Sequence, residues 1–92
     1  MALNVLWTQS AQMDRIRLYR FWNEKTGDSD YSKTIHQIIE DKLFQTRLFP
    51  DCGVETDRKE IRYHLIEKQY KLFYSIRNNS ILVLRLTSSL KN

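Results

Sequence analysis

The sequence contains few of the residues that cross-link a chain or interrupt its regular structure. Its 92 residues include one cysteine, one proline and two glycines. The single cysteine, Cys52, excludes a framework of intramolecular disulfide bonds and is compatible with a reducing compartment. Glycine and proline occur at Gly27, Pro50 and Gly53, and these positions mark two breaks between predicted elements.

Long apolar runs, leader sequences and clusters of metal ligands are also missing. No apolar run approaches the roughly 20 residues that cross a membrane as a helix. Residues 1–10 lack a basic start followed by a long apolar stretch, so no signal peptide is recognisable. Cys52 has no neighbouring cysteine, and no cluster of histidine and cysteine suggests a metal site. We therefore expect a cytoplasmic protein without metal, cofactor or membrane association.

Positive charge is in excess. The chain carries 15 Lys and Arg against 11 Asp and Glu, which gives a net charge of +4, and 41% of its residues are hydrophobic. This length and composition predict one globular domain over residues 1–92, with a modest core. The charge favours an anionic partner, either nucleic acid or an acidic protein segment, although many small proteins are equally basic without one.

The most strongly patterned stretch is Tyr70–Leu86, which predicts two strands joined by a turn at Asn78-Asn79. Asparagine accepts the positive φ angles that a two-residue hairpin turn needs. Aromatic and β-branched residues fill both arms. The register that follows from this turn places four pairs opposite each other: Ile76 and Ile81, Tyr74 and Val83, Phe73 and Leu84, and Leu72 and Arg85.

The apolar residues of this hairpin occupy both of its faces. One face holds Tyr70, Leu72, Tyr74, Ile76, Ile81 and Val83. The other holds Phe73, Leu82, Leu84 and Leu86. A hairpin exposed to water on one side would alternate more cleanly, so we expect inner strands that are covered at least partly on both sides. Arg85 is expected to lie over the sheet with its aliphatic stem packed.

The first half of the chain predicts a strand and two helices. Residues 3–8 alternate as a short strand, and Ser10 is the expected N-cap of a helix over residues 11–25. Gly27 is the expected C-terminal cap of that helix. A second helix is predicted over residues 31–47, where apolar residues again recur at helical spacing.

The second half predicts strands. Pro50 to Gly53 forms a turn after the second helix, residues 55–59 form a loop, and residues 60–65 form a strand. Runs of helices beside runs of strands indicate an α+β fold: an N-terminal strand, an antiparallel helical hairpin and a three-stranded antiparallel meander, all strands forming one sheet. The helices cover one face. The opposite face is expected to hold Phe73, Leu82 and Leu84, ringed by Arg62, Lys71 and Lys91.

Three stretches together resemble one protein family. They are VLWTQSA followed by MDRIRLYRFW at residues 5–22, FPDCG at residues 49–53, and QYKLFYSIRNNSILVLRL at residues 69–86. In this order they are similar to the RelE/ParE toxins of bacterial type II toxin–antitoxin systems. The resemblance implies a growth-inhibiting toxin that a cognate antitoxin neutralises, with an acidic amphipathic helix or strand of the antitoxin bound to the toxin.

The two branches of the family imply different activities. A ParE-like toxin acts by binding a target such as DNA gyrase, without nucleolytic chemistry. A RelE-like toxin is a ribosome-dependent, metal-independent mRNA endoribonuclease. The resemblance to the second branch implies that Arg62, Lys71 and Lys91 are the catalytic residues. His64 is a further candidate, either as a general base or as a partly buried structural histidine.

The sequence favours the ParE-like activity. The P-x-x-G turn at residues 50–53 fits that branch, and the end of the chain lacks the Tyr or His that the RelE-like branch often places there. An attenuated member of the family that binds its antitoxin and does little else is the third possibility.

Overall fold

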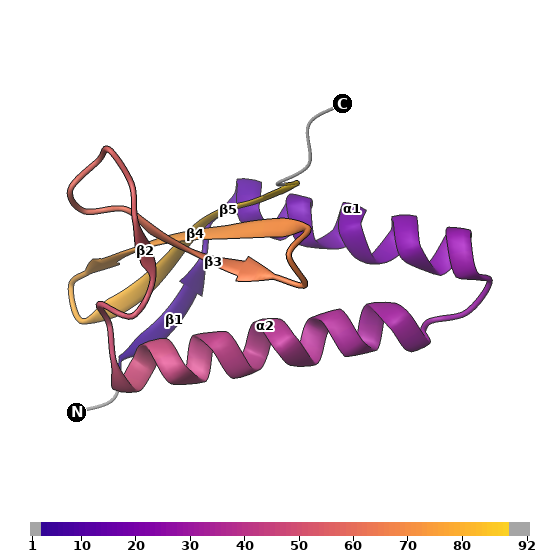
Figure 1. Ribbon diagram of the computed structural model, residues 1–92, viewed down its shortest axis with the longest axis horizontal. Helices are drawn as coiled ribbons and strands as arrows, with labels where there is room; N and C mark the ends of the chain where they lie inside the picture. The colour runs from indigo at the N-terminus through magenta and orange to yellow at the C-terminus, as the bar shows by residue number, and fades with distance from the viewer. Residues whose placement is uncertain (1–2, 89–92) are drawn as a thin grey trace.

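The computed structural model describes residues 3–88 and shows one sheet with two long helices packed against it (Figure 1). The elements are β1 (Asn4–Trp7), α1 (Gln9–Thr26), α2 (Asp30–Leu48), β2 (Val54–Glu55), β3 (Arg62–Ile66), β4 (Tyr70–Arg77) and β5 (Ser80–Ser88). The sheet has five strands in the order β1-β5-β4-β3-β2. β1 runs parallel to β5, and the other neighbours are antiparallel. The predicted α+β fold is confirmed.

The short strand β2 is the element that the sequence did not predict. Val54 pairs with Tyr63, and Glu55 pairs with Arg62. The polar character of residues 55–59 predicts a loop that begins at residue 55. Two residues are too few to carry a periodic signal, so their pairing depends on β3 lying beside them.

Helix α1 begins two residues earlier than predicted, because Thr8 and not Ser10 is its N-cap. The Thr8 hydroxyl accepts a hydrogen bond from the backbone N–H of Ala11 (3.1 Å) and donates one to the carbonyl oxygen of Leu84 (3.0 Å). Serine is on average a somewhat better helix cap than threonine. The second bond joins the start of the helix to β5 and favours Thr8 over Ser10 as the cap. It cannot be predicted from the sequence alone.

The two helices end close to Gly27 and Pro50, the residues that predicted their ends. Gly27 caps α1 with φ 83°, a left-handed conformation that glycine adopts without steric cost. The chain then turns back, and α2 runs antiparallel to α1 until the turn at Pro50 (Figure 1). Within residues 3–88, neither helix is long and apolar enough to cross a membrane.

The β4–β5 hairpin has the predicted turn but only half of the predicted register. Asn78 and Asn79 have φ angles of 49° and 62°, as a two-residue hairpin turn requires. The pairs next to the turn are as predicted, up to Tyr74 and Val83. A bulge then leaves Leu84 unpaired, so Phe73 lies opposite Arg85 and Leu72 lies opposite Leu86.

This bulge exchanges the two faces of β5 beyond Leu84. Leu86, which was predicted on the open face, is 6% exposed and belongs to the core. A single extra residue inverts every later side chain in a strand, because strand side chains alternate with a period of two. The hydrophobic pattern alone does not show the bulge, since Leu82, Leu84 and Leu86 are all apolar.

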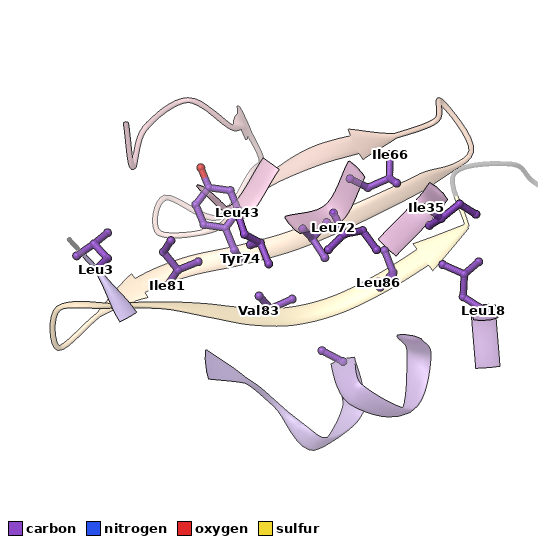
Figure 2. Close-up of a cluster of buried hydrophobic side chains, with 12 residues drawn as sticks. Leu3, Leu18, Ile35, Leu43, Ile66, Leu72, Tyr74, Ile81, Val83 and Leu86 are labelled. Carbon is purple, nitrogen blue, oxygen red and sulfur yellow. The ribbon is translucent and has the colours of Figure 1, made fainter. Parts of the chain in front are cut away.

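The core lies between the helices and one face of the sheet (Figure 2). It consists of Leu3, Ala11, Leu18, Ile35, Ile39, Leu43, Ile66, Leu72, Tyr74, Ile81, Val83 and Leu86. Four of the six strand residues in this core, Leu72, Tyr74, Ile81 and Val83, were predicted for this face, and Leu18, Ile35, Ile39 and Leu43 were predicted from helical spacing. Burial of each large aliphatic side chain contributes about 1.5–3 kcal/mol relative to leaving it in water.

Candidate functional site

The sheet face that points away from the helices is the surface on which the sequence placed its candidate site. Strand alternation puts Phe73, Leu82 and Leu84 there, as predicted, and all three are half-buried. We call this surface the open face. Lys71 and Tyr63 lie on it too, with the Lys71 Nζ 4.7 Å from the centre of the Tyr63 ring. Lys71 is therefore held by a cation–π contact at this face.

The loop between β2 and β3 forms a wall beside the open face. The Thr56 hydroxyl organises the loop, because it lies within hydrogen-bond distance of the carbonyl oxygens of Arg58 (3.0 Å) and Ile61 (2.9 Å). A shallow, largely apolar pocket of about 270 Å³ lies between this wall and the strands. It is lined by Thr56, Asp57, Arg58, Ile61, Phe73, Leu84, Arg85 and Thr87. Its shape suits contact with a partner's apolar side chain.

Arg62 does not share the open face with Lys71, and its predicted place on the rim is wrong. It lies opposite Tyr74, on the helix-covered side of β3. Its Nη1 donates to the carbonyl oxygen of Gly53 (2.9 Å), and its guanidinium lies 3.4 Å from Glu55 and 3.9 Å from Asp51. Arg62 therefore ties the turn after α2 to the sheet. Lys91, the third predicted residue, lies outside the described residues.

His64 is a buried structural histidine. It is 6% exposed, its Nε2 lies 2.8 Å from the Thr46 hydroxyl, and its ring stacks on Tyr74 with the ring centres 5.2 Å apart. Burial lowers its pKa from the ordinary value of 6.5, with a further contribution from the positive charge of Lys42. It lies on the face opposite Lys71, so the two side chains cannot act on one phosphate.

The P-x-x-G turn is clamped by a tyrosine that sequence reasoning placed only in the core. The Tyr74 hydroxyl donates to the carbonyl oxygen of Pro50 (2.8 Å) and accepts from the backbone N–H of Gly53 (3.0 Å). A Cβ atom at Gly53 would lie 2.6 Å from that hydroxyl oxygen. Glycine is therefore required because the tyrosine packs directly on the backbone. The features of the sequence that could have indicated this contact are the P-x-x-G turn and a tyrosine in the predicted hairpin.

Arg85 is anchored by an acidic residue of α1. Because of the bulge it lies opposite Phe73 and not Leu72. Its Nε and Nη2 donate to the two carboxylate oxygens of Asp14 (2.7 and 3.1 Å), and Asp14 also accepts from the backbone N–H of Leu86 (2.9 Å). Burial opposes ionisation of Asp14, but these hydrogen bonds outweigh it, so the pKa of the carboxyl lies below its ordinary value of 3.8.

The described residues thus form a surface suited to binding. Over residues 3–88, no group of three or more His, Cys, Asp and Glu side chains is arranged to hold a metal ion. The open face combines an apolar floor with the cations Lys71, Arg58 and Arg85. An apolar surface with a charged border is typical of protein–protein recognition.

Comparison with known proteins places this fold in a family. The model of the family described as the ParE toxin of the type II toxin–antitoxin system parDE matches residues 5–92. No curated protein matches the sequence. Among solved structures, one from a chromosomal ParDE system of P. aeruginosa superposes with a TM-score of 0.77 at 16% identity, covering 95% of this chain and 96% of that one.

Two further solved structures share the fold at lower similarity. The E. coli DinJ–YafQ toxin–antitoxin complex gives a TM-score of 0.60 at 13% identity, covering 96% of this chain and 93% of that one. A conserved hypothetical protein from Helicobacter pylori gives 0.58 at 22% identity, covering 95% and 94%. The match of the family model over nearly the whole chain shows that this protein belongs to the ParE toxin family of type II toxin–antitoxin systems.

Proposed function

We propose that this protein inhibits bacterial growth by binding DNA gyrase in the cytoplasm and that a cognate antitoxin neutralises it. The observation that carries the proposal is the ParE family match over residues 5–92. A solved structure from a ParDE system shares the fold and agrees with it, although at 16% identity that likeness concerns the fold alone.

The geometry of the open face supports binding over RNA cleavage. Metal-independent cleavage needs a base and a charge-stabilising group within hydrogen-bond reach of the same reacting centre. Lys71 lies on the open face, whereas Arg62 and His64 lie on the opposite face of β3. The residues that sequence reasoning assigned to the RelE-like alternative are therefore not brought together within residues 3–88.

Induced expression in a bacterial host tests the proposal. Gyrase-dependent DNA breaks and an SOS response should appear, while mapping of RNA 5′ ends should show translated mRNA intact. Cuts at codon positions without DNA breaks would instead establish the endoribonuclease. In that case Lys71→Ala should lower cleavage on the order of a hundredfold, and Lys33→Ala, an exposed lysine of α2, is the matched control. Unaffected growth with both assays silent would indicate an attenuated toxin.

The antitoxin is tested separately. The product of the reading frame adjacent to the gene should co-purify with this chain and restore growth when both are expressed. The net charge of +4 favours an acidic binding segment in that partner. Stable, harmless expression of this chain alone as a monomer would count against the proposal.

A further inference from the structure

The open face continues beyond its pocket as a wider apolar surface. Within residues 3–88, both helices pack on the other face of the sheet, where they enclose the core. Leu6 is 55% exposed, Val54 50% and Leu65 45%. Leu6 lies beside Leu82 of the neighbouring strand, which puts it on the open face. Val54 lies opposite Tyr63, and Leu65 follows Tyr63 by two positions, so both are on that face too. Scattered exposed apolar residues are ordinary, but a set that crosses a sheet marks a contact surface.

The bulge in β5 shapes the pocket at the centre of this surface. In a regular strand Leu84 and Arg85 would point to opposite faces, but because of the bulge both side chains line the pocket. Asp14 holds the Arg85 guanidinium through two hydrogen bonds. Ile61 lines the pocket from the loop between β2 and β3, and Figure 1 shows this loop rising from the sheet on the side away from α2. Hydrogen bonds within that loop fix the second wall. The pocket is therefore formed before any partner binds.

Two cations of the open face have no acidic partner in the described part of the chain. Arg58 lines the pocket and Lys71 lies on the neighbouring strand, and neither forms a salt bridge with a carboxylate of residues 3–88. Arg85 is different, because a carboxylate of α1 neutralises it. Asp57 is the one acidic residue among those that line the pocket. The balance of the unpaired groups is positive, which favours carboxylates in a partner.

These features favour a protein segment over the other possible occupants of the open face. A second copy of this chain, docked through the same face, would bring Lys71 and Arg58 against like charges. A DNA strand would set its phosphates against an apolar floor that offers them no hydrogen bonds. A protein segment can place a large apolar side chain in the pocket and carboxylates beside the two cations, so that both parts of the surface are matched.

We propose that the open face is the surface that binds DNA gyrase, and that it binds an acidic segment of the gyrase protein. One large apolar side chain of that segment enters the pocket beside Ile61 and Phe73, and its carboxylates pair with Lys71 and Arg58. The inference rests on the proposed function, because gyrase is the target proposed there. It assigns target binding to the sheet and leaves the exposed sides of the two helices out of that contact.

Binding of purified DNA gyrase holoenzyme to the full chain tests the proposal through two variants that keep the hydrogen bonds of the loop. Ile61→Ser removes an apolar wall of the pocket, while the bonds that hold residue 61 in the loop belong to its backbone. Arg58→Glu reverses an exposed charge, and the loop bonds of residue 58 also belong to its backbone. Each variant should weaken gyrase binding by about tenfold or more.

Matched controls carry the same changes on the helices. Ile16→Ser alters an exposed isoleucine of α1, and Lys33→Glu makes the same charge reversal at an exposed position of α2. Both controls should bind gyrase as tightly as the parent chain. Thermal melts of all four variants separate lost binding from lost folding. Arg58→Glu, at an exposed loop position, keeps the test decisive if Ile61→Ser proves unstable.

The outcomes separate this inference from the proposed function. Loss of gyrase binding in the folded pocket variants, with both controls still bound, supports the inference. Undiminished binding in the pocket variants, or an equal loss in the controls, overturns it and leaves gyrase as the target. Failure of the parent chain to bind gyrase overturns both. Two assays without gyrase detect the other occupants. Binding of a short DNA duplex that Arg58→Glu abolishes, or a dimer of this chain that Ile61→Ser dissociates, would each overturn the inference.

Discussion

The contact between Tyr74 and the turn at residues 50–53 should be essential to stability. Tyr74→Phe removes one hydroxyl group, which leaves the Gly53 N–H and the Pro50 carbonyl oxygen without this partner. The side chain of Tyr74 is 1% exposed, and Gly53 is also buried. Leaving a buried donor unsatisfied costs about 1–3 kcal/mol. For a domain of this size, each kcal/mol lowers the melting temperature by about 4–8 °C.

Gly53→Ala should destabilise the same contact from the other side. The new Cβ would lie 2.6 Å from the Tyr74 hydroxyl oxygen, 2.7 Å from its Cε1 and 3.0 Å from the Cβ of Arg62. The ring cannot retreat, because it is packed in the core and stacked on His64. Overpacking of this kind costs about 1–3 kcal/mol.

The two substitutions should be coupled. In the Tyr74→Phe background the closest of the clashing atoms is gone, so Gly53→Ala should cost about 0.5–3 kcal/mol less than in the parent protein. Urea unfolding of the parent, both single variants and the double variant measures this coupling. Tyr63→Phe, which changes a half-buried tyrosine of the open face, is the control and should shift stability by less than about 0.5 kcal/mol.

Two results would refute the reasoning. One is a Tyr74→Phe variant as stable as the Tyr63→Phe control. The other is additivity of Tyr74→Phe and Gly53→Ala, because residues in direct contact cannot act independently if the clash is the cause.

Three further predictions concern titration and backbone conformation. Asp14 has a lowered pKa in the folded state, so it contributes stability above the unfolded pKa near 3.8 that is lost as the pH falls through the folded value; urea unfolding of Asp14→Asn should show less of this acid sensitivity. His64 is also held below its ordinary pKa of 6.5, so stability should fall as the pH drops below about 6.5, and His64→Gln should remove that part of the profile. Glu67 has φ 55°, so Glu67→Gly should stabilise the β3–β4 turn by about 0.5–1 kcal/mol, whereas Gly27→Ala, at φ 83°, should destabilise α1 by about 1 kcal/mol in thermal melts.

Local signals predicted much of the fold. Gly27 and Pro50 ended the helices, and Asn78-Asn79 turned the hairpin, because these residues act through the geometry of their own backbone. Helical and strand periodicity placed Ile35, Ile39 and the neighbouring core positions correctly, since burial of one face is a property of each element by itself.

The candidate site was predicted less well because it depends on contacts between elements. The bulge at Leu84 places Leu86 in the core. No residue type in that strand indicates that a bulge occurs there. Arg62 was assigned to the rim although strand alternation puts it beside His64, on the face that the helices cover. Lys71 was placed correctly on the open face, since β4 has no irregularity between it and Phe73.

The pairing of β1 with β5 has a consequence for synthesis of the protein. The bond from Thr8 to Leu84 joins residues 76 positions apart, and β5 lies between β1 and β4. A ribosome adding about 5–20 residues per second completes β5 seconds after β1 has been made. Until then β1 has no neighbour and the core lacks Ile81 and Val83. A chain whose translation stops before Ser80 therefore lacks the strand that joins β1 to β4 and cannot assemble the five-stranded sheet.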